Sequence, residues 1–275
     1  CSYCIVPYVR GRERSRHMED ILREAEGLLE SGIQEIMLLG QNVNSYGNGG
    51  DETFPSLLRK LDELGVPRIR FMTSHPKDIS DELIYAMAGS QHICNHLHLP
   101  VQSGSNDILT AMNRRYTRER YLERVQAVRS AVPNIGLTTD LIVGFPGETD
   151  AQFAETVSLV ETVGYDSAFT FIYSPREGTA AAKMPGQLSE QVTGARIQQL
   201  ITTVETTAAR VHQSMIGLRE HVLVEGISKR DGGMVSGKGT RGITVALAGT
   251  SEDIGKIIPV QITSSAVNTL RGERL

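Results

Sequence analysis

Two cysteines, Cys1 and Cys4, open the chain with a C-x-x-C spacing. Paired thiolates at this spacing are typical of metal, iron–sulfur or redox sites. A zinc site would need a second C-x-x-C or a Cys/His pair, and none follows. A thioredoxin-like motif would lie between a strand and a helix in a chain of different layout. Taken alone, the pair leaves metal binding, cluster binding, redox chemistry and chance open.

A basic run follows these cysteines directly. It contains Arg10, Arg12, Arg14 and Arg16, interrupted in charge only by Glu13. Guanidinium groups form forked hydrogen bonds with phosphate and carboxylate oxygens. We therefore predict that this run contacts the phosphates of RNA, although Arg10 or Arg12 could instead bind a cofactor carboxylate.

The elements that must position these residues alternate regularly between helix and strand. Apolar side chains at helical spacing predict helices over residues 17–31, 54–65, 81–89, 105–132, 150–164 and 189–214. Short apolar runs predict strands over residues 33–40, 68–74, 92–100, 135–147 and 165–174. This alternation is typical of parallel strands joined by crossover helices, which allows either a doubly wound sheet or a barrel. In a barrel, the loops after the strands lie together at one rim, where active sites are built.

The pattern changes near Gly217. Short β-branched runs separated by glycines then predict a small all-β barrel of roughly 60 residues. We divide the chain into residues 1–214 and 215–275. Small barrels of this kind commonly bind oligonucleotides. The basic side chains predicted to contact RNA are Lys229, Arg230, Lys238, Arg241 and Arg271; the alternative is an ordinary charged surface.

Composition limits the kinds of partner. Residues 1–215 carry 20 basic and 26 acidic side chains, whereas residues 216–275 carry 8 and 6. An anionic partner would therefore meet local basic patches rather than a basic chain. Three cysteines do not suggest a disulfide framework, which favours a reducing compartment such as the cytoplasm. No apolar run approaches the ~20 residues of a membrane-spanning helix, so we expect no membrane contact. Separately, we expect the protein to be a monomer.

The opening stretch CSYCIVPYVRGRERSR resembles the distal part of the signature C-x-x-x-C-x-x-C of radical S-adenosylmethionine enzymes, in the form found in the methylthiotransferase family. Four further stretches resemble the branch of this family that modifies tRNA: LLGQNVNSYG (38–47), RFMTSHP (70–76), HLHLPVQSGS (96–105) and DLIVGFPGE (140–148). The similarity covers essentially the whole chain. It implies an α/β fold, a partial TIM-type (β/α) radical SAM barrel whose first strand is missing, followed by a TRAM-like all-β barrel.

The resemblance also implies cofactors. In this family three cysteines hold a [4Fe–4S] cluster, whose open iron binds S-adenosylmethionine and whose electron yields a 5′-deoxyadenosyl radical. Cys1 and Cys4 would be the second and third ligands, and the first would lie four residues before Cys1. The family also carries an auxiliary [4Fe–4S] cluster on an N-terminal domain. We therefore expect this chain to be a fragment that is inactive by itself.

Several rim residues have roles implied by the same resemblance. The cofactor-binding candidates are Gln41, Asn42, Gln102, Ser103, Asp140 and Gly144. The amides of Gln41 and Asn42 could instead cap their loop, and Asp140 could anchor a neighbouring loop rather than a ribose. Gly144, with Pro146 and Gly147, is expected to form a tight turn that lets the backbone approach the cofactor.

The implied reaction adds a methylthio group to C2 of N6-isopentenyladenosine at position 37 of tRNA, so the protein would be a transferase in tRNA processing. Its partners would be the tRNA anticodon loop and a reductase that donates electrons, and no further catalytic residue can be assigned. The alternatives are methylthiotransferases that act on a ribosomal-protein aspartate or on threonylcarbamoyladenosine, and a non-catalytic RNA-binding fragment. The loops GQNVNSYG and SHP speak against the first two.

Other polar residues remain open to two interpretations. His75, His96 and His98 could form a metal site, but satisfied barrel histidines are the better prediction. Cys94 is expected to be a packed thiol. The basic run over residues 113–120, with Arg114, Arg115, Arg118 and Arg120, is either a solvated helix face or a phosphate contact.

Overall fold

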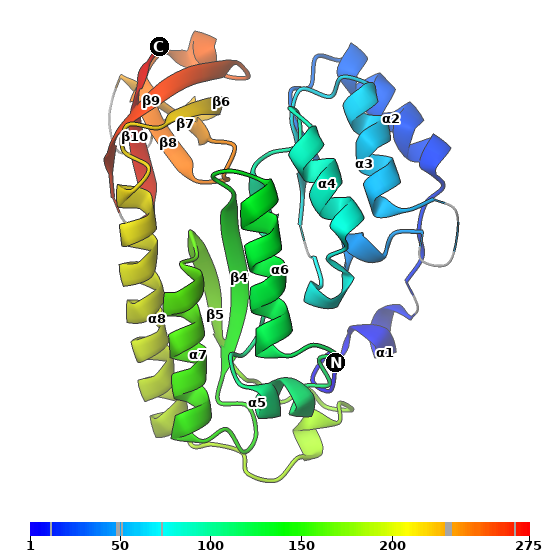
Figure 1. Ribbon diagram of the computed structural model, residues 1–275, viewed down its shortest axis with the longest axis vertical. Coiled ribbons are helices and arrows are strands. Elements are labelled where there is room, and N and C mark those ends of the chain that lie inside the picture. Colours follow the sequence, from blue (N-terminus) through cyan, green and yellow to red (C-terminus); the bar gives the residue numbers. More distant parts are fainter. Residues whose placement is uncertain (12, 48–49, 51, 73, 229–232, 267) are drawn as a thin grey trace.

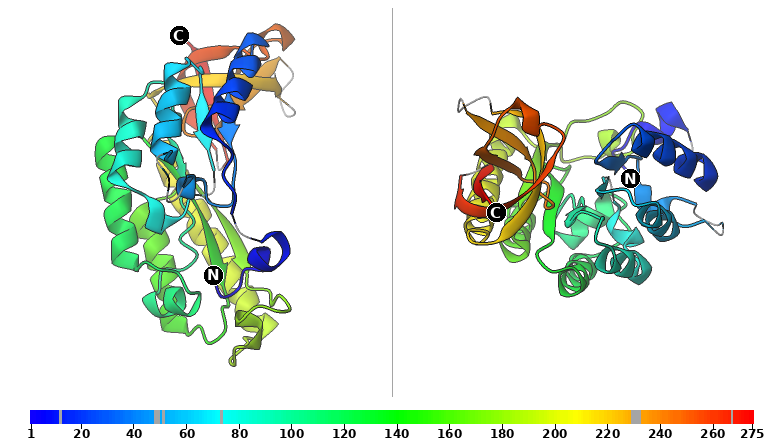
Figure 2. Two further views of the ribbon diagram at one scale, coloured as in Figure 1. Left: turned by 90° about the vertical axis from the view of Figure 1, so that its right-hand side faces the viewer. Right: turned by 90° about the horizontal axis from the view of Figure 1, so that it is seen from above.

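The computed structural model describes residues 1–275 except 12, 48, 49, 51, 73, 229–232 and 267. Its N-terminal part is a curved layer of parallel strands with helices along its outer side, and its C-terminal part is a small closed barrel (Figure 1). A turned view shows the curvature of this layer and the two parts lying along one long axis (Figure 2).

Five short parallel strands form the curved layer. In chain order they are β1 (Ile36–Leu38), β2 (Ile69–Phe71), β3 (His96–His98), β4 (Gly136–Val143) and β5 (Ser167–Ile172). The strands pair in that order: β1 with β2, β3 with β4, and β4 with β5. A parallel bridge between Ile69 and Ile93 joins the two sets. The predicted partial (β/α) barrel is confirmed, with β1 and β5 as its outermost strands.

Helices cover the outer side of the strands. They are α2 (Met18–Glu30), α3 (Phe54–Glu63), α4 (Asp81–Gly89), α6 (Arg118–Ala131), α7 (Asp150–Val163) and α8 (Glu190–Gln213). Five of these helices begin at a Ser or Thr whose hydroxyl accepts a backbone N–H of the first turn, which satisfies one of the unpaired donors there. Apolar side chains of helices and strands form one core, in which Leu58, Leu61 and Ile69 are fully buried.

The predicted helix over residues 105–132 differs from the structure, which has two helices. Helix α5 spans Asn106–Ala111 and α6 starts only at Arg118. Asn113 adopts a left-handed conformation with a φ of 55°, which ends the first helix. Thr117 then caps α6 by accepting the N–H of Arg120. A short helix α1 (Val6–Arg10), which sequence periodicity does not predict, follows the two cysteines.

The concave face of the layer carries a different set of side chains. Leu137, Thr139 and Leu141 of β4 are buried, whereas the alternating residues Thr138 and Asp140 are only half-buried. Side chains alternate between the two faces of a strand, so Thr138 and Asp140 point into the concave side. On β5, Phe169 lies beside Asp140 in the ladder and remains 56% exposed. The inner wall is therefore partly polar and partly aromatic.

The C-terminal strands close into a barrel. They are β6 (Arg219–Ile227), β7 (Met234–Lys238), β8 (Thr244–Ala248), β9 (Ile257–Ser265) and β10 (Thr269–Arg274), in the order β10-β8-β7-β6-β9. Inward-pointing Val222, Val235, Val245 and Leu270 are fully buried in its core. The predicted all-β barrel is confirmed.

The closed barrel docks on the N-terminal ends of the parallel strands. Arg68 donates to the carbonyl oxygens of His221 (2.7 Å) and Lys238 (2.9 Å), and Arg70 donates to that of Thr240 (3.1 Å). One carboxylate oxygen of Glu35 accepts from the Nε atoms of both arginines at 2.9 and 2.8 Å. Two buried guanidinium groups are thereby neutralised in part and aimed at the β7–β8 loop.

A second ion pair completes this interface. Arg241 donates to Asp166 at 2.6 Å, and the other Asp166 oxygen accepts the N–H of Leu137, the second residue of β4. Desolvation raises the pKa of Asp166, although the neighbouring Arg241 lowers it. The small barrel is therefore held to the end of the strands that lies away from Cys1 (Figure 1).

Among the described residues, none of the helices combines the length and the apolar character that crossing a lipid bilayer requires.

We predict that Glu35→Ala destabilises the docking of the two parts. The change leaves Arg68 and Arg70 buried, each with 4% of its side chain exposed, without their shared carboxylate. The expected loss in the free energy of unfolding is about 3 kcal/mol, measured by urea denaturation. The control is Glu63→Ala, which removes the exposed pair with Lys60 and should cost less than about 1 kcal/mol. Equal effects of the two changes would contradict this interpretation of the interface.

Candidate active site

The loop that carries the two cysteines lies across the carboxyl-terminal rim of the strands. Ser2 donates its N–H to the carbonyl oxygen of Met112 at 3.0 Å and its hydroxyl to that of Ala111 at 2.8 Å. The carbonyl oxygen of Ser2 accepts the N–H of Ala181 at 2.9 Å. The loop is thus tied to the segments that follow β3 and β5.

Tyr3 anchors the same loop on the segment that follows β4. Its ring packs edge-on against Phe145, which follows β4, with centroids 6.2 Å apart. Burial raises the pKa of Tyr3 to about 12, and the nearby Arg114 acts in the opposite direction. The side chain between the cysteines is therefore an anchor, which leaves Cys1 exposed and Cys4 half-buried at the rim.

Arg114 contacts the first cysteine. Its Nη1 atom lies 3.0 Å from the Sγ atom of Cys1. The same guanidinium donates through Nε to the hydroxyl of Tyr116 at 3.1 Å and through Nη2 to the carbonyl oxygen of Pro100 at 3.2 Å. Because three of its nitrogens are engaged, the guanidinium is held rigidly with a donor aimed at the sulfur.

Tyr116 and His75 complete this part of the rim. The hydroxyl of Tyr116 donates to the carbonyl oxygen of Val101 at 2.9 Å. The ring of His75, from the loop after β2, meets the Tyr116 ring edge-on at 5.6 Å. Burial, followed by the positive charges of Arg114 and Lys77, lowers the pKa of His75 to about 3. His75 is therefore neutral at physiological pH.

The loop after β3 holds two of the predicted cofactor residues in different surroundings. Gln102 has a φ of 71° and pairs with Leu141 in an isolated parallel bridge. Ser103 is fully buried, and its hydroxyl lies 3.3 Å from that of Thr156 in α7. At Gly104 an added Cβ would lie 2.5 Å from the carbonyl oxygen of Glu155, so only glycine fits. Gln102 is held at the rim, whereas the Ser103 hydroxyl is engaged in packing.

Asp140 lies in β4, and Gly144 is the first residue after that strand. Asp140 points into the concave face, and its Oδ1 lies 3.5 Å from Nε2 of His98. Gly144 has a φ of 75° and donates its N–H to Glu148 at 2.8 Å, which closes the predicted tight turn. Arg196 of α8 donates to the same Glu148 oxygen at 2.8 Å. The glycine loop is therefore fixed by a buried ion pair.

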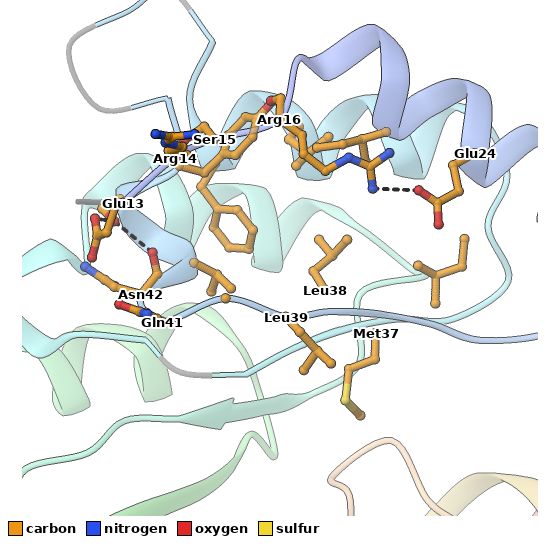
Figure 3. Close-up of a pocket in the computed structure, with 18 of the residues that line it drawn as sticks. Glu13, Arg14, Ser15, Arg16, Glu24, Met37, Leu38, Leu39, Gln41 and Asn42 are labelled. Carbon is orange, nitrogen blue, oxygen red and sulfur yellow. Dashed lines mark hydrogen bonds and ion pairs between the residues drawn. The ribbon is translucent and has the colours of Figure 1, made fainter. Parts of the chain in front are cut away.

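Gln41 and Asn42 lie at the end of a large cavity along β1. The cavity measures about 1450 Å³ and is lined by residues 10, 11 and 13–16, by α2 and by β1. Figure 3 shows Met37 and Leu39 on one side of the strand and Leu38 on the other. Asn42 donates to Asp78 at 2.7 Å and accepts the N–H of His75 at 3.1 Å, so its amide bridges two rim loops. Gln41 is exposed.

The predicted RNA-binding residues are not placed alike. Arg10 and Arg271 are exposed. Arg241 is engaged with buried Asp166 between the two parts, so its predicted contact with RNA is replaced by a structural ion pair. Lys238 is half-buried, and its Nζ donates to the hydroxyl of Thr244 at 2.9 Å. Arg12, Lys229 and Arg230 lie outside the described residues.

Cys94, the barrel histidines and the arginines of residues 113–120 are the remaining polar residues with a prediction. Cys94 is buried, and burial raises its pKa, as expected of a packed thiol. His96 and His98 both bond to Thr138 and are therefore satisfied barrel histidines. In the basic run, Arg114 and Arg118 are engaged within the protein, whereas Arg115 is exposed.

The cysteine loop fits part of a cluster site. Cys1 and Cys4 are free thiols on one short loop, with a guanidinium donor beside the first. Thiolates are the ligands of iron–sulfur clusters, and hydrogen bonds to their sulfurs tune the cluster. Among the described residues, no group of three His, Cys, Asp or Glu side chains is arranged to hold a metal ion. The described residues thus offer two thiols on one supported loop, which are candidates for cluster ligands.

Two family models match the chain. The model of the radical SAM superfamily matches residues 1–160, and the model of the TRAM domain matches residues 213–275.

Curated relatives are similar over nearly the whole chain. The chain is 51% identical over 266 residues to the "tRNA-2-methylthio-N(6)-dimethylallyladenosine synthase" of Lachnoclostridium phytofermentans, covering 96% of this chain and 58% of that protein. It is 52% identical over 276 residues to the protein of the same name from Thermoanaerobacter sp., covering 99% of this chain and 59% of that protein. The chain therefore spans about three fifths of the length of these relatives. The predicted resemblance to the tRNA branch of the methylthiotransferases is confirmed.

Solved structures share the fold at low sequence identity. The radical S-adenosylmethionine methyltransferase TsrM of Kitasatospora setae superimposes with a TM-score of 0.55 at 18% identity, covering 66% of this chain and 36% of that one. Coproporphyrinogen III oxidase of Escherichia coli superimposes with a TM-score of 0.51 at 16% identity, covering 93% of this chain and 65% of that one.

The sequence leaves the roles of Arg114 and Tyr116, both in the run over residues 113–120, undecided, and it assigns none to Tyr3. Arg114 reaches Cys1 from far away in the chain, Tyr116 supports Arg114, and Tyr3 anchors the cysteine loop on the distant Phe145. The signal in the sequence for Arg114 and Tyr116 is the density of arginine and tyrosine over residues 114–121, shortly after the loop at residues 96–105.

We predict that Arg114→Leu loosens the cysteine loop. The change removes the donors to Cys1, Tyr116 and Pro100, each hydrogen bond being worth about 1 kcal/mol. Amide exchange at Ala181, which bonds to Ser2, should accelerate roughly tenfold in NMR-detected hydrogen exchange. The matched control is Arg115→Leu, an exposed neighbour that should leave the rate unchanged. No acceleration in the Arg114 variant would show that the guanidinium does not hold the loop.

We also predict an acid-sensitive contribution from His75. Unfolded histidine takes up a proton near pH 6.5, but folded His75 does so only near pH 3. Between these values the unfolded state binds more protons, so stability falls as the pH decreases. His75→Gln, which keeps a side-chain acceptor for the N–H of Lys77, should flatten this dependence. The measurement is urea denaturation from pH 7 to pH 4, and parallel curves for both proteins would refute the assignment.

Proposed function

We propose a function that starts from the family to which this chain belongs, the radical SAM superfamily. The chain is the barrel and RNA-binding part of an enzyme that adds a methylthio group to C2 of N6-isopentenyladenosine in tRNA. The observation that carries the proposal is the docking of the Cys1–Cys4 loop on the rim, beside the glycine-rich loops after β3 and β4. The names of the relatives, about half identical over nearly the whole chain, supply the reaction and the substrate.

Different rim residues would bind the iron–sulfur cluster and S-adenosylmethionine. Cys1 and Cys4 would hold an iron–sulfur cluster, which supplies the electron that cleaves S-adenosylmethionine. The Arg114 guanidinium donates to the Cys1 sulfur and keeps positive charge beside it. Asp140, on the concave wall, offers carboxylate oxygens that can accept hydrogen bonds from ribose hydroxyls.

Backbone groups would shape the rest of this site. The left-handed backbone at Gln102 and at Gly144 turns both loops sharply at the ends of the strands. The buried contacts of Glu148 with Gly144 and Arg196 keep the second loop in place. A rigid rim of this kind orients a bound cofactor and limits the access of water to it.

RNA would contact the closed barrel as well as the rim. The small barrel carries exposed Arg271, and the segment before α2 carries exposed Arg10. Strand β4 has eight residues, which corresponds to roughly 26 Å between its two ends. A tRNA stem-loop is long enough to be held by the barrel while one unstacked base reaches the rim. Bases in a loop can be turned out at lower cost than bases in a duplex.

The proposal predicts that Cys4→Ala abolishes methylthiolation, whereas Cys94→Ala, which changes a buried thiol away from the rim, retains it. The natural full-length protein would be expressed in a bacterial strain that lacks the modification. Mass spectrometry of tRNA nucleosides would then measure 2-methylthio-N6-isopentenyladenosine. Loss of product in both variants at equal protein levels, or in neither, would overturn the assignment of the site. A modified threonylcarbamoyladenosine would assign a different substrate, and tRNA binding without product would favour a non-catalytic role.

A further inference from the structure

Two neighbouring strands, β3 and β4, contribute a continuous polar chain to the concave wall. Nε2 of His96 lies 3.0 Å from the hydroxyl oxygen of Thr138, and Nδ1 of His98 lies 2.9 Å from the same oxygen. The other ring nitrogen of His98, Nε2, lies 3.5 Å from Asp140. The order is therefore His96, Thr138, His98 and Asp140, and its last member is the cofactor candidate on β4.

Protons can be distributed along this chain in one consistent way when both histidines are neutral. An ionised carboxylate only accepts hydrogen bonds, so Nε2 of His98 faces Asp140 with its N–H. Nδ1 of His98 is then an acceptor and takes the hydroxyl proton of Thr138. The Thr138 oxygen in turn accepts the N–H of His96. Each donor in the series points toward Asp140.

The surroundings of His96 favour the neutral form that this order requires. His98 is only 4% exposed, and its ring packs edge-on against Phe169 at 6.2 Å. Burial and the nearby Arg70 lower the pKa of His96 to about 3. Protonated His96 would have to lose contact with water and approach a guanidinium, so it stays neutral at physiological pH.

We propose that the Asp140 carboxylate and the Thr138 hydroxyl together fix the tautomer of His98, and that His98 thereby acts as a positioning residue that orients the Asp140 carboxylate on the inner wall. Within the described part of the chain, His98 is the side chain in contact with the Asp140 carboxylate, which lies on a half-buried surface. The consequence for binding, that an oriented Asp140 receives the ribose of the cofactor, rests on the proposed function. The proton order itself does not depend on it.

The test is nitrogen NMR on the 275-residue chain labelled with ¹⁵N-histidine. Long-range ¹H–¹⁵N correlations distinguish the protonated from the unprotonated ring nitrogen. At pH 7.5, His96 and His98 should both carry the proton on Nε2. A proton on Nδ1 of His98, or on both of its nitrogens, would overturn the proposal.

Variants of Thr138 distinguish the effect of its hydroxyl group from the effect of its side-chain size. Thr138→Val keeps the shape but has no hydroxyl, so the His98 signals should become those of a mixture of both tautomers. Thr138→Ser should restore the single tautomer. Thr170→Val, a hydroxyl removed from neighbouring β5 outside the chain of contacts, should leave His98 unchanged. Retention of one tautomer in Thr138→Val would show that Asp140 alone fixes it and would overturn the part proposed for Thr138.

A second measurement connects the chain to the cofactor. In the full-length protein loaded with its cluster, His98→Leu should raise the KM for S-adenosylmethionine about tenfold with a smaller change in kcat, as expected for lost orientation of a binding group. His98→Gln, which retains an N–H donor, should recover most of this loss. If the tautomers are as expected but Asp140→Asn leaves this KM unchanged, the proton order stands and the cofactor role of Asp140 is wrong.

Discussion

The docking of one short loop on the carboxyl-terminal rim is the constraint on which the rest of the site depends. Ser2 exchanges hydrogen bonds with Ala111, Met112 and Ala181, and Tyr3 fills an aromatic space beneath. These partners lie more than 100 residues away along the chain, so the loop is positioned only when the curved sheet has formed. Parallel strands make this possible, because their carboxyl ends meet along one edge.

Much of this architecture follows from the pattern of the sequence. The alternation of helix and strand predicts the five parallel strands, and the glycine-separated β-branched runs predict the closed barrel. The break at Asn113 could not be read in the same way, because asparagine in a polar helical stretch is compatible with either conformation. The CSYC spacing and the rim loops identified the family, but not how the cysteines are supported.

The arginines show why side-chain roles resist prediction. Arg68, Arg70, Arg196 and Arg241 all lie in buried contacts, although nothing local in the sequence distinguishes them from exposed Arg10 or Arg115. A guanidinium is placed inside only when acceptors from distant segments converge on it, as Glu35 and the β7–β8 loop do for Arg68. Basic residues counted along a chain therefore overstate the charge available to a nucleic acid.

The contacts of Arg68 and Arg70 with the closed barrel also fix the distance between that barrel and the rim that carries the cysteines. Arg68 and Arg70 hold the barrel against one end of strands whose other end carries the cysteines. A long polymer gripped at the first place can present only the unit that falls at the second. Under the proposed function, the choice of target would therefore depend on separation along the substrate as well as on the shape of the base.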